Sequence, residues 1–342
     1  MKAFYLACSI LFIIACGRQN SIDSFNGDWL IPPGEVFDGG PGKDGIPSVD
    51  NPSFIDAADV TFLDDNDLVI GVYHNGKAKA IAHRILDWHE IVNDNIDDMD
   101  YALVYCPLTG TGSSWNRNVN NSVTTFGVSG LLYNTNIIPY DRGSDSNWSQ
   151  IRLDAVNGDL IGERVETFPV LETTWATWKK YNPDSQVMTF NTGFSRNYSQ
   201  YPYGDYRTNN SRIIFPVSNT DSRLPAKERV LALLDESLQR VYSIELFQED
   251  RVISDTYLGE DILVFGSKNE NYITAYYNQN LVNPVPSDED GIMAIDDNGN
   301  KISILGEIVE GPLNGTQLTQ VNSMIAYFFS IGAFYPDVEI YN

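Results

Sequence analysis

Positively charged residues are scarce in this sequence of 342 residues. Lys and Arg together number 22 against 46 Asp and Glu, which gives a formal net charge of −24. The acidic residues are spread along the whole chain rather than gathered in one tail. Because no basic stripe is present to neutralise phosphates, the composition argues against nucleic acid or an anionic lipid surface as a partner.

The hydrophobic run at the start of the chain is too short to span a membrane. Lys2 precedes an apolar run from residue 3 to residue 15, whereas a spanning helix needs about 20 apolar residues. A positive start and a short hydrophobic run predict a secretory signal. The run ends in "IIAC", which resembles a bacterial lipobox and implies cleavage before Cys16 and lipidation of its thiol. The alternative is an ordinary signal followed by a chance cysteine.

These features predict a lipid-anchored protein of the bacterial cell envelope, on its periplasmic or its outer face. Residues 1–15 would form the signal peptide, and residues 16–37 the lipidated cysteine and a polar tether. Residues 38–342 would form a single domain. The membrane partner would be held through the lipid on Cys16.

Cysteine is almost absent from the rest of the chain. Cys8 would leave with the signal and Cys16 would carry the lipid, so Cys106 would remain as the one free thiol. The mature chain could then form no intramolecular disulfide. A free thiol in an oxidising compartment is a liability unless it is buried, bound to a metal or used chemically.

Short strand-like segments and glycine or asparagine turns fill most of the sequence. Asn75-Gly76 predicts a tight hairpin, as does the Asn-Gly pair at 298–299. Two short helices are predicted, over "HRILDWHEIVND" (83–94) and over "LETTWATWKKYNPD" (171–184), the second capped by Thr173 or Thr174. The sequence lacks the regular alternation of a parallel α/β protein. It therefore predicts the α+β class, as a β-rich single domain of mostly antiparallel strands and hairpins.

The familiar catalytic motifs are missing. The chain contains no P-loop, no G-x-S-x-G elbow, no H-E-x-x-H and no C-x-x-C. The remaining constellation is His89, Glu90 and Cys106, with the cysteine at the end of the strand-like "YALVY" and before a Pro/Gly loop. These three are the candidate catalytic residues, and Cys106 should lie within about 5 Å of the His89 ring.

Three interpretations of this constellation stay open. A histidine base beside an accessible cysteine would make an activated thiol nucleophile. The sulfur of Cys106 and a ring nitrogen of His89 would equally suit a single transition metal, namely zinc, copper or iron, with Glu90 in the shell. The third interpretation is an inert buried thiol beside a core histidine.

Ordered segments along the chain resemble a known family. They are "GGPGKDGIPSVDNPSF", "HNGKAKAIAHRILDWHEIVND", "YCPLTGTG", "FGVSGLLYNTNIIPYDRGSDSNWSQ", "TTWATWKKYNPD", "YPYGDY", "RLPAKERVLAL" and "AFYPDVEIY". Together they resemble bacterial domain-of-unknown-function family 3179, from about residue 38 to the C-terminus. The resemblance implies a secreted or lipid-anchored protein and no established reaction. An apolar residue would be expected at His83, which makes a role for that histidine doubtful.

The same resemblance draws attention to a second set of residues as candidates for binding. They are Asp141, Arg142, Trp148, Tyr201, Tyr203 and Asp205. If their aromatic rings were exposed, they would suit a non-catalytic module that binds a glycan or a protein partner. The alternatives are a local Asp141–Arg142 ion pair and ordinary aromatic packing. A small-molecule partner also stays open.

Overall fold

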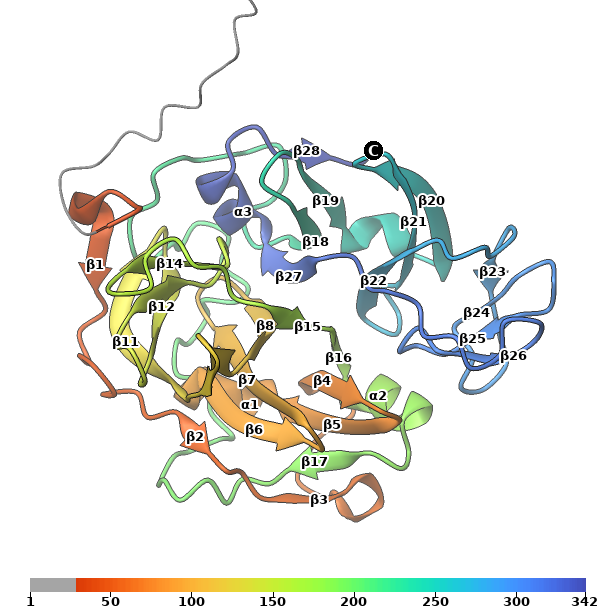
Figure 1. The fold of residues 1–342 in the computed structure, drawn as a ribbon, viewed down its shortest axis with the longest axis horizontal. Helices are drawn as coiled ribbons and strands as arrows, with labels where there is room; N and C mark the ends of the chain where they lie inside the picture. Colours follow the sequence, from red (N-terminus) through yellow and green to blue (C-terminus); the bar gives the residue numbers. More distant parts are fainter. Residues whose placement is uncertain (1–28) are drawn as a thin grey trace, which may run out of the picture.

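Short antiparallel strands make up most of residues 29–342, the part of the chain that the computed structural model describes (Figure 1). Three α-helices accompany the strands in this part, each seven residues long: α1 (His83–His89), α2 (Trp175–Tyr181) and α3 (Phe328–Phe334). The predicted β-rich α+β class is confirmed. Within the same residues, no helix is both long and apolar enough to cross a membrane. The proposed signal peptide and Cys16 lie outside the described residues.

Three five-stranded sheets form the first half of the fold. The first has the order β1 (Val36–Asp38), β11 (Phe126–Tyr133), β12 (Asn136–Asp141), β13 (Asn147–Ser149), β14 (Asp154–Asn157). The second has the order β15 (Thr167–Phe168), β8 (Thr111–Asn116), β7 (Met99–Cys106), β6 (Ile91–Ile96), β2 (Val49–Asp50). The third has the order β16 (Val170–Thr174), β4 (Leu68–His74), β5 (Lys77–Ala82), β17 (Gln186–Met188), β3 (Phe54–Asp56). A small hairpin joins β9 (Asn118–Val119) to β10 (Ser122–Val123).

The second half contributes three smaller sheets. One has the order β27 (Ser323–Tyr327), β18 (Arg229–Leu234), β19 (Gln239–Ser243), β28 (Glu339–Ile340). The next is β20 (Arg251–Tyr257), β21 (Glu260–Ser267), β22 (Tyr272–Tyr277). The last, at one edge of the molecule in Figure 1, is β23 (Val285–Pro286), β24 (Ala294–Ile295), β25 (Lys301–Ile302), β26 (Ile308–Glu310). Short 3-10 turns occur at Pro33–Glu35, Ala57–Asp59 and Ile244–Phe247.

Local sequence signals explain several of these elements. The Asn75-Gly76 hairpin between β4 and β5 is confirmed, and both turn residues have the positive φ that such a turn requires. Helix α2 is confirmed as well: the side chain of Thr174 accepts a hydrogen bond from the amide of Thr177, and the helix ends before Asn182.

Helix α1 is shorter than predicted. It ends at His89, because Glu90 adopts a positive φ of 59° and stops the helical path. The β-branched Ile91 and Val92 then pair with β7 as the start of β6. Pairing of these two residues with β7 therefore outweighs the apolar spacing that predicted a helix as far as residue 94.

Residues before the predicted boundary at residue 38 also pack against the sheets. Trp29 forms a bridge to Asn157, and Ile31 is buried against Ile138 and Val156. The end of the predicted tether is therefore packed against the first sheet, because its apolar side chains find a place in the core.

The largest buried cluster joins the two halves of the chain. It holds Cys106 and Trp115 from the second sheet, Val230 from β18, and Phe328 and Ile331 from α3. Cys106 therefore lies at the seam between the halves rather than at the molecular surface.

Candidate functional site

The turn at Cys106 connects β7 to β8 and carries the predicted thiol. Pro107 follows the last residue of β7, and Gly110 has a φ of +59° immediately before β8. A Cβ atom at Gly110 would lie 2.9 Å from the ring of Tyr327. Glycine is thus required at position 110 for two reasons: the positive φ of the backbone and the close approach of the Tyr327 ring.

Distant parts of the chain hold this turn in place through its carbonyl groups. The hydroxyl of Tyr206 donates to the Leu108 carbonyl at 2.8 Å, and the amide of Tyr327 donates to the Thr109 carbonyl at 2.7 Å. Leaving these buried carbonyls without donors would cost free energy, so the hydrogen bonds stabilise the observed conformation of the turn.

Buried side-chain amides brace the strands on either side. The amide nitrogen of Gln150 donates to the carbonyls of Val104 and Thr111 at 2.9 Å each. The amide of Asn136 links the Gln150 carbonyl to the hydroxyl of Thr109. These bonds join the first sheet to the β7–β8 pair.

The Cys106 side chain is fully buried in this framework. Its thiol lies 3.7 Å from the carbonyl of Thr135. Burial, followed by the nearby Glu90 carboxyl, raises the pKa of Cys106 to about 11. At neutral pH the group is a thiol rather than a thiolate, which does not favour the activated nucleophile.

His89 has different neighbours from Cys106. Its Nδ1 is 2.7 Å from the Pro47 carbonyl, and its Nε2 is 2.7 Å from the hydroxyl of Tyr198. The carbonyl can only accept, so Nδ1 carries the proton and the Nε2 lone pair accepts from the tyrosine. Within residues 29–342 no hydrogen bond or ring contact joins His89 to Cys106, so the predicted pairing finds no support.

A metal centre finds no support in the surrounding residues either. Within the described part of the chain, no group of three or more His, Cys, Asp and Glu side chains is placed to hold a metal ion. Both ring nitrogens of His89 are engaged, by the Pro47 carbonyl and the Tyr198 hydroxyl. The two residues therefore do not fit zinc, copper or iron in this arrangement.

Glu90 is the most unusual of the predicted residues. It has φ 59° and ψ −34°, which is rare for a residue other than glycine. Its side chain is buried, and burial raises its pKa to about 8. The Oε2 atom has no hydrogen-bond partner. A strained backbone and an unpaired buried carboxyl together mark a candidate functional position.

Glu90 lines a cavity of about 70 Å³ beside the Cys106 turn. Apart from Glu90, most of the walls are apolar, with the hydroxyl-bearing ring of Tyr203 on one side. The main apolar contributors are Ile46, Leu108, Val128, Ile137 and Phe215. A residue with a buried carboxyl group thus lines a small, mainly apolar cavity.

Two of the predicted binding residues are structural. Trp148 is only 1% exposed, and its Nε1 donates to the Asp141 carboxylate at 3.0 Å. Asp141 also accepts from the amide and the hydroxyl of Ser144. The buried Trp148 ring does not meet the exposure that a glycan platform requires.

Arg142 forms ion pairs with Asp44 and Asp50 rather than with its neighbour Asp141. It lies 2.9 Å from Asp44 and 3.6 Å from Asp50, so the local Asp141–Arg142 ion pair is wrong. The arginine ties the segment before β2 to the end of β12.

The three candidates in "YPYGDY" have different surroundings. The guanidinium of Arg207 lies 4.1 Å from the centre of the Tyr201 ring, and Tyr203 lines the Glu90 cavity. Asp205 is exposed and pairs with Arg212 at 2.7 Å. Of these residues, only Tyr203 is brought to Glu90.

The structure adds Lys227, which the sequence analysis did not identify. Its side chain is buried beneath aromatic rings, and its Nζ has no hydrogen-bond partner. The charge of a Cys106 thiolate would act on its pKa, so the lysine belongs to the same neighbourhood. A lysine in a polar stretch before a strand carries no local signal of burial.

His83 is buried, as the apolar residue expected at this position would be. It is 3% exposed, neither ring nitrogen has a hydrogen-bond partner, and Nε2 lies 3.7 Å from the Glu172 carboxylate. Burial, with Arg207 and Arg229 nearby, holds its pKa well below the ordinary value. The residue is thus a neutral imidazole at the seam between the halves.

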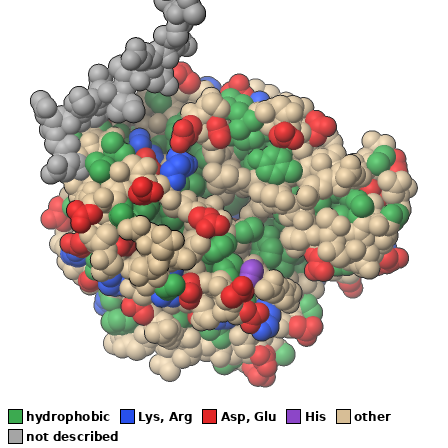
Figure 2. All heavy atoms as spheres, in the orientation of Figure 1, with side chains coloured by type: hydrophobic (Ala, Val, Ile, Leu, Met, Phe, Trp, Pro, Cys, Tyr) green, Lys and Arg blue, Asp and Glu red, His purple; other side chains and the backbone are tan. Residues whose placement is uncertain are grey.

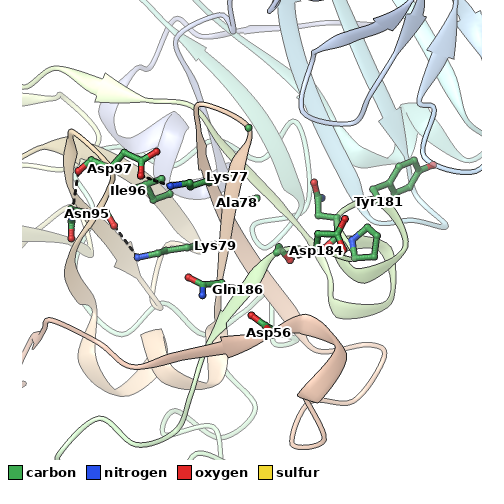
Figure 3. A pocket seen from close by; sticks show the side chains of 14 residues that line it. Asp56, Lys77, Ala78, Lys79, Asn95, Ile96, Asp97, Tyr181, Asp184 and Gln186 are labelled. Atoms are coloured by element: carbon green, nitrogen blue, oxygen red, sulfur yellow. Dashed lines mark hydrogen bonds and ion pairs between the residues drawn. The ribbon is translucent and has the colours of Figure 1, made fainter.

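A larger hollow than the Glu90 cavity lies elsewhere in the described chain. Figure 3 shows this hollow of about 680 Å³ between the β4–β5 turn, the β6–β7 turn and the loop after α2. Its two lysines point to acidic partners, Lys77 to Asp97 at 2.5 Å and Lys79 to Asp94 at 2.7 Å. Both lysine charges are therefore already paired, and the carboxyl-bearing Asp56 and Asp184 also line the hollow.

The fold and the Cys106 turn define a β-rich α+β protein with a buried, largely apolar site. The chain belongs to the family described as "Protein of unknown function (DUF3179)", whose model matches residues 43–338. Neither the curated proteins nor the solved structures gave a significant match to the chain.

Proposed function

We propose that the protein is a lipid-anchored binding protein of the bacterial cell envelope. Its ligand is a small molecule with an apolar body and one polar head group, held in the cavity beside Glu90. The observation that carries the proposal is the Glu90 carboxyl, which is buried, unpaired at Oε2 and one wall of a mainly apolar cavity.

The physical argument starts from the cost of that carboxyl. A buried polar group without a partner costs about 1–3 kcal/mol, which a ligand with a matching head group would recover. With a pKa of about 8, Glu90 is mainly protonated at neutral pH. A neutral carboxyl both donates and accepts, so it matches a head group such as an amide.

Ligand binding at Glu90 is better supported than a role of Cys106 as a thiol nucleophile or as a metal ligand. The thiol is fully buried and keeps its proton, and the His89 ring bonds to Pro47 and Tyr198. The envelope location rests on the lipobox-like "IIAC" at residues 13–16. The surface in Figure 2 shows acidic side chains scattered over the viewed face, which suits a protein that does not bind polyanions.

Butyramide is a suitable probe, because its carbonyl and amide groups can pair with a neutral carboxyl while its short chain enters the cavity. We expect saturation-transfer NMR to detect butyramide on the wild-type protein. Glu90→Gln should retain binding, because the amide still donates and accepts. Glu90→Leu should lose it.

Asn95→Leu provides the matched control, because Asn95 is exposed and lines the large hollow instead. It should bind butyramide like the wild type. Circular dichroism would confirm that each variant is folded. Equal signals from the wild type and Glu90→Leu, or no signal from the wild type, would contradict the proposal.

A further inference from the structure

Three polar side chains form a row across the third sheet, inside the larger hollow. Gln186 of β17 pairs with Lys79 of β5 on one side and with Asp56 of β3 on the other. Residues that lie directly opposite each other on neighbouring strands point to the same face of a sheet. All three residues line the hollow, and Figure 3 shows them following one another in this order. The sheet therefore presents a polar surface to whatever enters the hollow.

Two hairpins and one loop surround this row. The β4–β5 turn contributes Lys77, the β6–β7 hairpin contributes Asn95 and Asp97, and the loop after α2 contributes Asp184. The volume of about 680 Å³ lies within the range of about 300–1,000 Å³ that is typical of small-molecule sites. The walls of most such sites are apolar, whereas most side chains around this hollow are polar. These walls therefore suit a hydrophilic ligand.

Several of the lining groups are free to bind such a ligand. Within residues 29–342 the side chains of Asp56, Asp184 and Gln186 form no hydrogen bond or ion pair, and all three residues are exposed. In the same part of the chain, the ammonium group of Lys77 donates to Asp97 alone and keeps two further protons to donate. The hollow thus offers carboxylate acceptors, an ammonium donor and an amide that both donates and accepts.

The mixture of charges does not favour a charged ligand. An anion would be repelled by the aspartates of the lining, and a cation would be repelled by Lys77 and Lys79. Asp56 and Asp184 are exposed, so water screens their attraction for a cation. A sugar hydroxyl brings no charge and both donates and accepts, so it can bond to either kind of group.

We propose that this hollow binds a short neutral saccharide. The sugar hydroxyls donate to Asp56 and Asp184, accept from Lys77, and do both with Gln186. The hollow and the Glu90 cavity share no lining residue. The saccharide site is therefore a second site, beyond the ligand binding proposed at Glu90.

The test uses neutral disaccharides as probes, namely lactose, maltose, cellobiose and diacetylchitobiose. Saturation-transfer NMR would compare them with putrescine as a cation and glucuronate as an anion. We expect at least one disaccharide to bind, and to bind more tightly than either charged compound. Tighter binding of putrescine or glucuronate, or no binding by any disaccharide, would overturn the proposal.

One variant assigns the binding to the hollow. Gln186→Leu should weaken binding of the disaccharide at least about tenfold, because leucine keeps the size of the side chain but can neither donate nor accept. Gln248→Leu is the matched control, because Gln248 is exposed and lies outside the hollow, and it should bind like the wild type. Circular dichroism would confirm that both variants are folded. Equal binding by Gln186→Leu and the wild type would also overturn the proposal, whereas butyramide binding decides the Glu90 site independently.

Discussion

Cys106, Glu90 and Lys227 lie around one turn, and burial is the largest influence on the pKa of each. Burial raises the pKa of the thiol and the carboxyl and lowers that of the amine, because it disfavours every charged form. At neutral pH this neighbourhood is therefore mostly uncharged. That condition suits an uncharged ligand better than thiolate chemistry.

The buried thiol should resist alkylation in the native protein. Because Cys106 is fully buried and its pKa is about 11, iodoacetamide at pH 8 should leave it unmodified by intact-mass measurement. The same reagent should alkylate Cys106 after unfolding in guanidinium chloride, which is the control. Rapid modification of the folded protein would restore the nucleophile interpretation.

Replacing Glu90 by glutamine should change how stability depends on pH. Between the usual carboxyl pKa of 4.5 and the folded value of about 8, the folded wild type keeps a proton that the unfolded chain releases. Raising the pH through this window therefore destabilises the wild type, and the variant escapes this loss. The variant should gain about 3 kcal/mol relative to the wild type between pH 5 and pH 8.

Urea unfolding at several pH values would measure this difference. Glu249→Gln is the control, because Glu249 is exposed, and its difference from the wild type should stay nearly constant with pH. A Glu90→Gln difference that is equally flat would show that Glu90 is charged in the folded protein.

At the scale of elements, the β7–β8 turn depends on segments that are remote in sequence. The backbone of β27 and the hydroxyl of Tyr206 satisfy its carbonyls, and the ring of Tyr327 packs on Gly110. The turn is thus a contact between the two halves as well as a hairpin.

Substitution of two glycines separates these two roles. Gly110→Ala and Gly76→Ala both place alanine at a positive φ, but only at Gly110 would the new Cβ meet another residue, the Tyr327 ring. We expect a loss of about 1 kcal/mol for Gly76→Ala and of about 2–4 kcal/mol for Gly110→Ala. Equal losses in chemical unfolding would show that the ring can move aside at no cost.

Across the whole molecule, a buried ion pair joins the halves. Arg229 of β18 lies 2.7 Å from Glu172 of β16, and both side chains are largely buried. His83 and Arg207 lie close to this pair. The positive charge of Arg207 acts both on the pKa of His83 and on that of Glu172. The seam therefore combines apolar packing with one enclosed group of charges.

Breaking this pair should cost far more than breaking a surface pair. Glu172→Gln should lose about 2–4 kcal/mol of unfolding free energy, because it leaves Arg229 buried without its counter-charge. Glu236→Gln removes the partner of the exposed Arg164, at 2.9 Å, and should cost less than about 1 kcal/mol. Similar losses in the two variants would show that water reaches the seam.

The proposed membrane attachment would also be a property of the whole molecule. Cys16→Ser should release the protein from the membrane fraction or leave the unprocessed precursor. Serine has no sulfur atom, so it cannot form the thioether bond to the lipid. Fractionation and immunoblotting would measure this, with Cys106→Ser as the matched cysteine control. Unchanged processing and anchoring of the Cys16 variant would end the lipobox interpretation.

Local patterns in the sequence were sufficient for much of the fold. Asn75-Gly76 predicted its hairpin and Thr174 its cap, because a two-residue turn and a helix cap depend on neighbouring residues. Helix α3 was not predicted, because the apolar "FFSIGAF" has the spacing of a buried strand as readily as that of a helix. The end of α1 was misplaced for a related reason, since pairing with β7 draws Ile91 into a strand.

The sequence by itself determined the acidic, β-rich character of the protein and the single cysteine of residues 29–342, and it predicted an N-terminal signal, which stays a prediction. These follow from composition and from spacing along the chain. Only the tertiary structure decided which groups meet: Glu90 faces an apolar cavity, His89 bonds to Tyr198, and Lys227 enters an aromatic cage. The physical reason is that burial sets these protonation states, and the burial of a side chain depends on segments more than a hundred residues away.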